Sequence, residues 1–333
     1  MNLKQQSNKL IFIIINIQMT NKISTIATTK VLNKLLFMAF IILIPTVSFS
    51  QMGSQYWKKF KNEIYFSSSA TAYLGDLGGG VESGNHSLSD INPAATKYAV
   101  AIGLRSKLTE IVTFRLDLAY GQASGADSLT KNLDRKNRNL SFRTNFISFS
   151  PIIEAYIIPE RFGRGASPFS LYVATGIRFI YFNPQAELDG IWYDLQPLGT
   201  EGQLANSGSA SYSKFTVGLP FIFGFKYALP SSKGGKSGAW TIGFESSATW
   251  LMTDYFDDVS TTYADPEAIR ITSGNIGAEL SDRRTSSSNG SGGGIRGNPS
   301  ANDWIGMLSV TIGKQLYSRS GRSRRTPSRG SYF

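Results

Sequence analysis

The chain has 333 residues, a length that in a soluble protein would indicate one to three domains. The absence of cysteine excludes disulfides, thiolate metal sites and a lipid anchor on an N-terminal cysteine, and the single histidine, His86, argues against a histidine-rich metal site. The net charge of +11 lies at the two ends: five Lys/Arg in the first fifty residues and five in the last fifteen, without acids, leave 24 basic against 23 acidic residues between them. A nucleic-acid-binding face is therefore not expected.

Residues 1–50 are predicted to be an export signal outside the fold. An apolar run from Leu35 to about Val47 follows a basic residue, and small residues precede a cut after Ser50. The run of about thirteen residues is short against the roughly twenty of a membrane-spanning helix. A secretory signal peptide is therefore preferred to a transmembrane anchor, and residues 1–18 are interpreted as an over-extended start of the gene.

The mature chain alternates apolar with small or polar residues at a period of two, which is typical of strands with two different faces. In Phe215–Tyr227 every odd position is apolar, and Pro220 predicts a bulge or kink. Trp240–Trp250 repeats the pattern with a tryptophan at each end of one face. At roughly 3.3 Å per residue and a tilt of about 40°, these tryptophans are about 25 Å apart along a barrel axis, the height of the apolar band of an outer-membrane barrel.

Eight such segments occur along the chain: 62–74, 96–108, 111–122, 140–158, 168–183, 213–229, 238–252 and 303–317. The connections alternate between short and long, and an even strand number with this alternation is typical of bacterial outer-membrane barrels. The sequence therefore predicts an all-β fold, an eight-stranded antiparallel transmembrane β-barrel over 62–317. A soluble barrel of the lipocalin type is the alternative, and it would place the apolar face inside.

This fold predicts a localisation in the cell outer membrane, with both termini periplasmic and the long loops extracellular. A short periplasmic lead at 51–61 would precede the barrel. Trp240, Trp250 and Trp304 would lie in the aromatic girdles at the two membrane interfaces.

Charged residues alternate with apolar ones on several strands and are predicted to point into the lumen. They are Arg115, Asp117, Arg143, Arg178 and Glu245. The lumen of an eight-stranded barrel is filled by side chains, and unpaired buried charge is costly. The preferred interpretation is a structural ion-pair network, with a path for solutes as the alternative.

The stretch DYFDDVSTTYAD, Asp254 to Asp265, has four carboxylates at the end of the seventh strand. An EF-hand loop is excluded, because apolar side chains occupy its third and sixth positions. A looser calcium site of Asp254, Asp257 and Asp258 remains an alternative, and no other metal site is expected.

The preferred interpretation of this stretch is a rim loop. Tyr255 and Phe256 would hold the loop base at the membrane interface. The aspartates would face water or pair with Arg283 or Arg284 in the same loop.

Residues 318–333 follow the last strand and have five arginines: Arg319, Arg322, Arg324, Arg325 and Arg329. The preferred interpretation is a disordered periplasmic tail, and the alternative is a docking arm for an acidic partner, peptidoglycan or lipid phosphates. His86 lies in the first long loop beside two serines and an aspartate, which seldom form a preorganised site in a flexible loop. No catalytic residue is therefore expected, and the glycine-rich segments lack the spacing and lysine of a phosphate-binding loop, so no cofactor is expected.

Several motifs occur in one order along the mature chain: AYLGDLGG (72–79), RNLSFRTNF (138–146), SPF (167–169), FNP (182–184), LQPLGTEGQ (195–203), DYFDDVSTTYADP (254–266) and SDRR…RGNPSANDW (281–304). In these motifs the chain resembles the PorG-like outer-membrane protein family of Bacteroidetes. The arginine-rich tail does not match the family pattern.

The resemblance implies a non-enzymatic accessory of the type IX secretion system, a machine that exports proteins across the outer membrane, often alongside gliding motility. In that family the barrel is associated with a periplasmic ring formed by the PorK lipoprotein and PorN. A PorK-like lipoprotein, a PorN-like subunit and outer-membrane lipid are therefore the implied partners. The alternative function is a general surface barrel for wall attachment, adhesion or small-solute passage.

Overall fold

The computed structural model describes residues 61–77, 93–130, 132–160, 167–205, 211–229, 239–284 and 294–316. The predicted signal peptide, nearly all of the predicted lead, His86 and the arginine-rich tail lie outside the described residues. No helix in this part of the chain is long and apolar enough to cross a membrane.

The described residues form ten strands, two α-helices and three short 3-10 helices. In chain order they are β1 (Asn62–Leu74), η4 (Pro93–Ala95), β2 (Lys97–Lys107), β3 (Val112–Ala126), η5 (Asp127–Leu129), α2 (Leu133–Arg138), β4 (Ser141–Ile158), β5 (Phe169–Gly176), β6 (Arg178–Leu188), β7 (Ile191–Asp194), η6 (Gln196–Leu198), β8 (Phe215–Leu229), β9 (Trp240–Leu251), α3 (Pro266–Ser281) and β10 (Trp304–Leu316).

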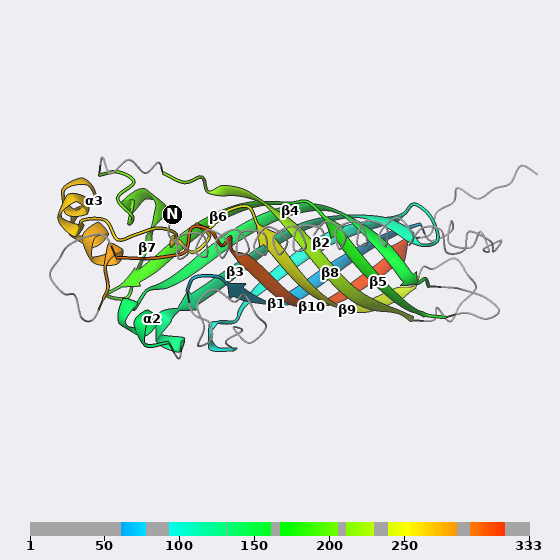
Figure 1. Cartoon of the computed structure of the whole chain (residues 1–333). Helices are drawn as coiled ribbons and strands as arrows, with labels where there is room; N and C mark the ends of the chain where they lie inside the picture. Colours follow the sequence, from blue (N-terminus) through cyan, green and yellow to red (C-terminus); the bar gives the residue numbers. More distant parts are fainter. Residues whose placement is uncertain are drawn as a thin grey trace, which may run out of the picture. The chain divides into compact units, whose positions relative to one another are not determined.

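The strands close into an antiparallel ring (Figure 1). The first strand pairs with the last along its whole length, from Asn62 opposite Leu316 to Leu74 opposite Trp304. Strands β5 and β6 lie in line between β4 and β8, and β7 extends β6 as a hairpin. The ring therefore has eight positions around its circumference, and the predicted all-β antiparallel barrel is confirmed.

The fifth predicted strand is interrupted at Ile177, which separates β5 from β6. The pairing to β8 has the same register on both sides of the gap, with Thr175 opposite Phe221 and Arg178 opposite Gly218. Pro220 lies in the matching gap on β8, where it has no N–H to donate. The predicted bulge in β8 is wrong, because β8 pairs with β9 without a register shift, and the irregularity lies in the neighbouring strand.

The apolar face of the barrel points outward. In β8 Phe215, Phe221 and Phe223 are 72%, 54% and 51% exposed, whereas Ile222 and Lys226, at the alternate positions of the strand, are buried. Large exposed apolar side chains occur in the same way on all eight positions of the ring. The lipocalin-type alternative, with its apolar face inside, is therefore wrong.

The predicted girdle tryptophans lie at the two ends of this apolar surface. Trp250 and Trp304 are directly opposite each other in the β9–β10 ladder, near the long connections. Trp240 lies at the other end of β9, opposite Lys314, whose Nζ is 4.8 Å from the centre of its ring.

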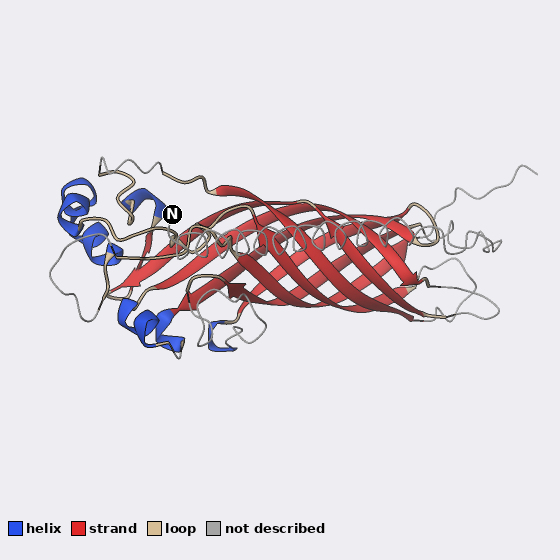
Figure 2. Cartoon of the chain, in the orientation of Figure 1, coloured by secondary structure: helices blue, strands red, loops and turns tan. Residues whose placement is uncertain are grey.

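The connections differ between the two ends of the barrel. The short ones join β2 to β3, β4 to β5 and β8 to β9, and the long ones lie at the opposite end. Both α-helices belong to long connections, and Figure 2 shows them at the same end of the strands. This end, the mouth, contains the motif residues considered below.

A closed ring of hydrogen-bonded strands should resist detergent at room temperature. The chain, folded in detergent, is expected to migrate differently on a denaturing gel before and after boiling, because only the boiled sample loses the ring. Identical migration of the two samples would contradict a closed barrel.

Candidate functional site

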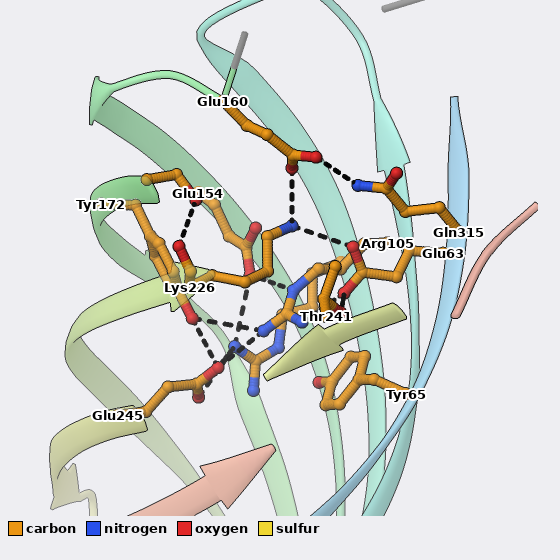
Figure 3. Close-up of polar contacts among 12 residues, drawn as sticks. Glu63, Tyr65, Arg105, Glu154, Glu160, Tyr172, Lys226, Thr241, Glu245 and Gln315 are labelled. Atoms are coloured by element: carbon orange, nitrogen blue, oxygen red, sulfur yellow. Dashed lines mark hydrogen bonds and ion pairs between the residues drawn. The ribbon is translucent and has the colours of Figure 1, made fainter. Parts of the chain in front are cut away.

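The interior of the barrel is divided into two layers. Many charged and hydroxyl side chains lie in the half near the short turns, and Figure 3 shows polar contacts among some of them. The half near the mouth has an apolar cluster that includes Tyr73, Phe142, Phe146, Phe182 and Phe256. Each layer is built by inward positions of the same alternating strands.

Arg105 is at the centre of the charged layer. Its guanidinium lies 2.8 Å from Glu154, 2.9 Å from Glu63 and 2.6 Å from Glu245, so it joins β2 to β4, β1 and β9 (Figure 3). It also lies over the ring of Tyr65 at 4.0 Å. One side chain thus connects four strands of the ring.

Arg115 makes a second junction beside the first. It lies 2.6 Å from Asp117 on the same strand and 3.0 Å from Glu245 on β9. The hydroxyl of Tyr65 donates to Asp117, and the hydroxyl of Tyr172 donates to Glu245 at 2.6 Å. These tyrosines fit because glycines face them: a Cβ on Gly103 or Gly224 would lie 2.3 or 2.5 Å from the rings of Tyr65 and Tyr172, respectively.

The network continues toward the short turns through Lys226. Its Nζ lies 2.9 Å from Glu63 and 3.7 Å from Glu160, and Lys107 is also 3.7 Å from Glu160. The side-chain amide of Gln315 donates to Glu160 at 2.6 Å (Figure 3).

The buried charges of this layer balance. Among the described residues, five acids (Glu63, Asp117, Glu154, Glu160 and Glu245) face five bases (Arg105, Lys107, Arg115, Arg178 and Lys226). Burying a charge is tolerated when it is paired and hydrogen-bonded. A neutral, hydrogen-bonded interior is therefore the arrangement that a narrow barrel requires, and it leaves little room for a solute path.

The predicted lumen residues are only partly brought together. Arg115, Asp117 and Glu245 meet, but Arg143 donates to Gln185 near the mouth and lies 3.7 Å from the ring of Trp192. Arg178 donates to the hydroxyls of Ser150 and Thr249, at 3.1 and 2.8 Å, rather than to a carboxylate.

Besides Glu160, which follows β4, the network contains five charged strand residues that the prediction omitted: Glu63, Arg105, Lys107, Glu154 and Lys226. Each occupies an inward position of the period-two pattern. That pattern, followed through every strand, is the signal that could have identified them.

At the mouth, the stretch 253–263 folds back over the barrel and is not a water-facing rim. Phe256 is fully buried, and its ring lies 5.3 Å from Phe182 and 6.2 Å from Phe146. Thr144 donates to the carbonyl of Phe256 at 2.7 Å. The predicted position of Phe256 at the membrane interface is therefore wrong, because the ring fills the top of the apolar layer.

The aspartates of this stretch are buried as well and do not pair with the predicted arginines. Asp258 accepts hydrogen bonds from Thr200 and Tyr212, and Arg296 lies 3.6 Å from it. Arg284 pairs with Asp282 instead, and Arg283 donates to a backbone carbonyl. Burial explains why Asp258 has these partners, because a buried carboxylate needs hydrogen-bond or ionic partners within the buried site. Arg283 and Arg284 have their partners elsewhere.

Segments 196–203, 253–263 and 294–303 together form what we term the mouth cap. Glu201 accepts from the backbone N–H groups of Ser260 and Thr261, and Arg296 donates to Glu201 at 3.0 Å and to the carbonyl of Asp258. A single bridge between Thr262 and Ile295 adds a backbone connection.

Arg138 fastens the cap to the neighbouring connections. It holds Asp127 through two hydrogen bonds of 2.7 Å and donates to the backbone carbonyls of Asp76 and Arg296. Bidentate pairs of this kind are among the stronger hydrogen-bonded contacts in proteins.

The cap and the residues around it include members of nearly all the motifs on which the family resemblance depends. Tyr73 and Asp76 come from the first motif, Arg138 and Phe142 from the second, Phe182 from FNP, and Thr200 and Glu201 from LQPLGTEGQ. Asp303 and Arg296 come from the last. The motif order was thus a sequence signal for this site, although it gave no information about the contacts.

The weak calcium interpretation of Asp254, Asp257 and Asp258 finds no support. Asp257 accepts from Tyr73 and from the backbone of Val259, while Asp258 faces Thr200, Tyr212 and Arg296. Within the described ranges no group of three or more acidic or histidine side chains is arranged to hold a metal ion.

Burial changes the protonation of these groups. It raises the pKa of Asp254 to about 9, with the nearby Asp257 adding to the rise and Ser260 opposing it. It raises the pKa of Asp258 to about 6, against the opposing effect of Arg296. The pKa values of Asp257 and Asp303 lie well above the usual range, through burial first and then through neighbouring carboxylates.

No protein-family model and no curated protein matches the chain. Among solved structures it is similar to Neisserial surface protein A, with 9% identity over 77% of this chain and 97% of that chain and a TM-score of 0.35. It is also similar to Ail, the attachment invasion locus protein of Yersinia pestis, solved with a heparin analogue (7%, 77% and 98%, TM-score 0.34). A further match is the outer membrane protein OprG from Pseudomonas aeruginosa (10%, 78% and 98%, TM-score 0.33). Sequence identities and TM-scores as low as these do not indicate the function of the chain.

Removing one member of the charged layer should be costly. Glu245→Gln leaves Arg105 and Arg115 short of a carboxylate, and the expected loss of stability is roughly 3–5 kcal/mol. It should appear as a lower temperature for the gel-mobility transition. Glu267→Gln is the matched control, because Glu267 and its partner Arg270 are more than half exposed, and its effect should stay within about 1 kcal/mol.

Proposed function

We propose that the chain is a non-enzymatic barrel of the bacterial outer membrane. The single observation that supports this best is the reversal of the usual pattern of a soluble barrel, with an apolar outer wall and a charged, paired interior. An exposed apolar surface on every strand would make a soluble monomer aggregate, whereas hydrocarbon tails cover it without cost.

The distribution of tryptophans supports the same placement. Trp250 and Trp304 at one end and Trp240 at the other bound the apolar band as aromatic girdles do. In this placement the short turns and both termini face the periplasm, and the cap faces outward.

If the barrel spans a bilayer, the loss of stability caused by a charged side chain on the outer wall depends on the depth of that side chain in the bilayer. Phe223 faces outward between the two levels of tryptophans, since β8 pairs Leu219 with Trp250 and Leu229 with Trp240. Phe223→Arg is expected to destabilise the barrel in vesicles by ~2–4 kcal/mol, because it places a cation near the bilayer middle.

Phe215→Arg is the matched control, because Phe215 is equally outward but lies beyond the Trp250 level. Its expected cost is about 0–1 kcal/mol. Equal costs for the two variants in a denaturant titration would contradict a membrane position for this wall.

We further propose, on the motif resemblance, a role in type IX secretion, in which the barrel anchors or orients the periplasmic ring. The same motifs contain most of the residues that form or contact the cap. Formation of the cap would therefore explain why these motif residues lie close together. A filled interior suits an anchor better than a pore.

The alternative function is a general surface barrel for wall attachment, adhesion or small-solute passage. The long connections and the cap would face the outside in it, but the paired charges inside the barrel disfavour passage.

Copurification tests the secretion role. The tagged chain, extracted from cell envelopes in mild detergent, is expected to bring down a PorK-like lipoprotein and a PorN-like subunit. A chain ending at residue 317 tests docking by the arginine-rich tail, and it should recover less of the ring if the tail is the docking arm. Recovery of no ring subunit by the full chain, alongside normal secretion in a deletion strain, would favour the surface-barrel alternative.

A further inference from the structure

Seven buried acids lie in the mouth cap and in the connections that it contacts. The acids are Asp76 after β1, Asp127 in η5, Glu201 after η6, Asp254, Asp257 and Asp258 after β9, and Asp303 before β10. The arginines with described contacts in this region are Arg138 and Arg296, and both are engaged: Arg138 by Asp127, and Arg296 by Glu201 and Asp258. Among the described residues, no salt bridge reaches Asp254, Asp257 or Asp303. This differs sharply from the balanced charged layer below.

The hydrogen bonds around Tyr73 require an additional proton. Its hydroxyl lies 2.6 Å from Asp257 Oδ2, is also hydrogen-bonded to Asp303 Oδ1, and accepts from the backbone N–H of Asp76 at 3.2 Å. A phenol has one proton and can donate it to only one carboxylate. The other carboxyl group must therefore be protonated and donate to the phenol oxygen.

The hydrogen bonds of the other oxygen atom in Asp257 and in Asp303 indicate where that proton lies. Asp257 Oδ1 accepts from the backbone of Val259 at 2.9 Å, and Asp303 Oδ2 accepts from the backbone of Phe256 at 3.0 Å. Only the oxygens that face Tyr73 are left to hold the proton. The pair connects the cap stretch 253–263 to the start of β10 through a side chain of β1.

Asp254 gives a second, independent observation. Asp254 is 7% exposed, neither carboxylate oxygen meets the geometric criteria of a hydrogen bond among the described residues, and the side chain of Ser260 only partly opposes the effect of burial. Its neighbours Asp257, Asp76 and Glu201 have the same sign of charge. A buried, unpaired carboxylate beside other carboxylates is costly, whereas the neutral acid is tolerated.

We propose that the mouth cap is a proton-dependent latch: Asp257 and Asp303 share one proton through Tyr73, Asp254 retains another, and loss of these protons releases the stretch 253–263 from the barrel. The latch does not depend on the secretion role. It makes the closure of the mouth a function of the pH outside the barrel.

The sign of the dependence follows from the raised pKa of Asp254, about 9 in the closed cap. A released aspartate titrates near 4, so the closed cap binds more protons than the open one between about pH 4 and pH 9. The closed cap is therefore most stable below about pH 4 and becomes less stable as the pH rises toward 9. For each retained proton, the equilibrium between closed and open cap shifts toward the open cap by about tenfold per pH unit. Asp258 adds to this only up to about pH 6, where its own pKa lies.

The absence of cysteine from the chain allows a direct test. A single thiol from Val259→Cys reports opening, since Val259 belongs to the cap stretch 253–263 and is 1% exposed in the closed cap. A thiol from Met252→Cys, at a position that is 59% exposed, is the reference that corrects for the pH dependence of the thiolate itself. The ratio of the two labelling rates with a maleimide, measured on the full barrel in detergent, is expected to rise at least tenfold per pH unit from pH 7 to pH 9.

Two sets of variants separate the latch from general loosening. Asp303→Asn together with Asp254→Asn mimics the protonated groups, because an amide can donate to Tyr73 and accept from the backbone of Phe256. This variant should keep the ratio low and flat to pH 9. Asp258→Asn is the matched control, because it removes the carboxylate charge that faces Arg296 at 3.6 Å and leaves the Tyr73 group intact. It should raise the ratio at every pH while keeping the slope.

The latch is overturned if the ratio in the otherwise unchanged chain stays flat from pH 6 to pH 9, a result that needs no aspartate variant to fold. It is also overturned if the double variant shows the same slope as the unchanged chain. A ratio that rises on adding a chelator at constant pH, and falls again with calcium, would assign the closure to a bound cation instead of protons.

Discussion

The structure depends on charge neutrality inside a narrow ring. An outer wall of apolar side chains forces every polar side chain of eight antiparallel positions into one small space. Arg105, which contacts carboxylates from three other strands, and Arg115 beside it meet this constraint together with Glu63, Glu154 and Glu245. Because these contacts join strands far apart along the chain, the network also holds the ring in one register.

Buried charged groups are accommodated in two different ways inside the barrel. Near the short turns, acids and bases occur in equal number and neutralise each other. At the mouth, Asp254, Asp257 and Asp303 have no salt bridge among the described residues, and in the proposed latch the phenol of Tyr73, backbone N–H groups and bound protons take the place of cations. The first arrangement is insensitive to moderate pH change, since its partners are fixed charges, and the second is sensitive.

The strands were predictable because their physics is local. An alternating pattern reports a two-faced wall, and its boundaries agree with those observed to within a few residues for β1, β2 and β10. The break at Ile177 was not predictable from β8, because it arises from how two neighbouring strands meet. The lumen partners were only partly predictable, since Arg143 and Arg115 look alike in sequence and differ only in their height along the barrel.

The cap was the least predictable part. Nothing local distinguishes a buried Phe256 or Asp257 from residues of a wet loop, because their partners lie on other connections, such as Thr144 and Tyr73. Several residues of the ordered motifs lie in this region, but the motifs did not predict which of those residues are in contact. The sequence of an acid-rich stretch taken alone therefore suggests a calcium site or a solvent-exposed loop. Burial of its acids in protonated form can be inferred only when the neighbouring residues in the fold are known.

The bond between Tyr73 and Asp303 joins residues 230 positions apart, at the outer end of the seam where β1 meets β10. Asp303 directly precedes the strand that completes the ring, so this contact cannot form until the whole chain has been synthesised and its two ends have paired. Any intermediate in assembly that lacks β10 has neither a closed wall nor a closed mouth. The closed mouth therefore forms only after β1 and β10 have paired, and its presence reports that the last strand is in place.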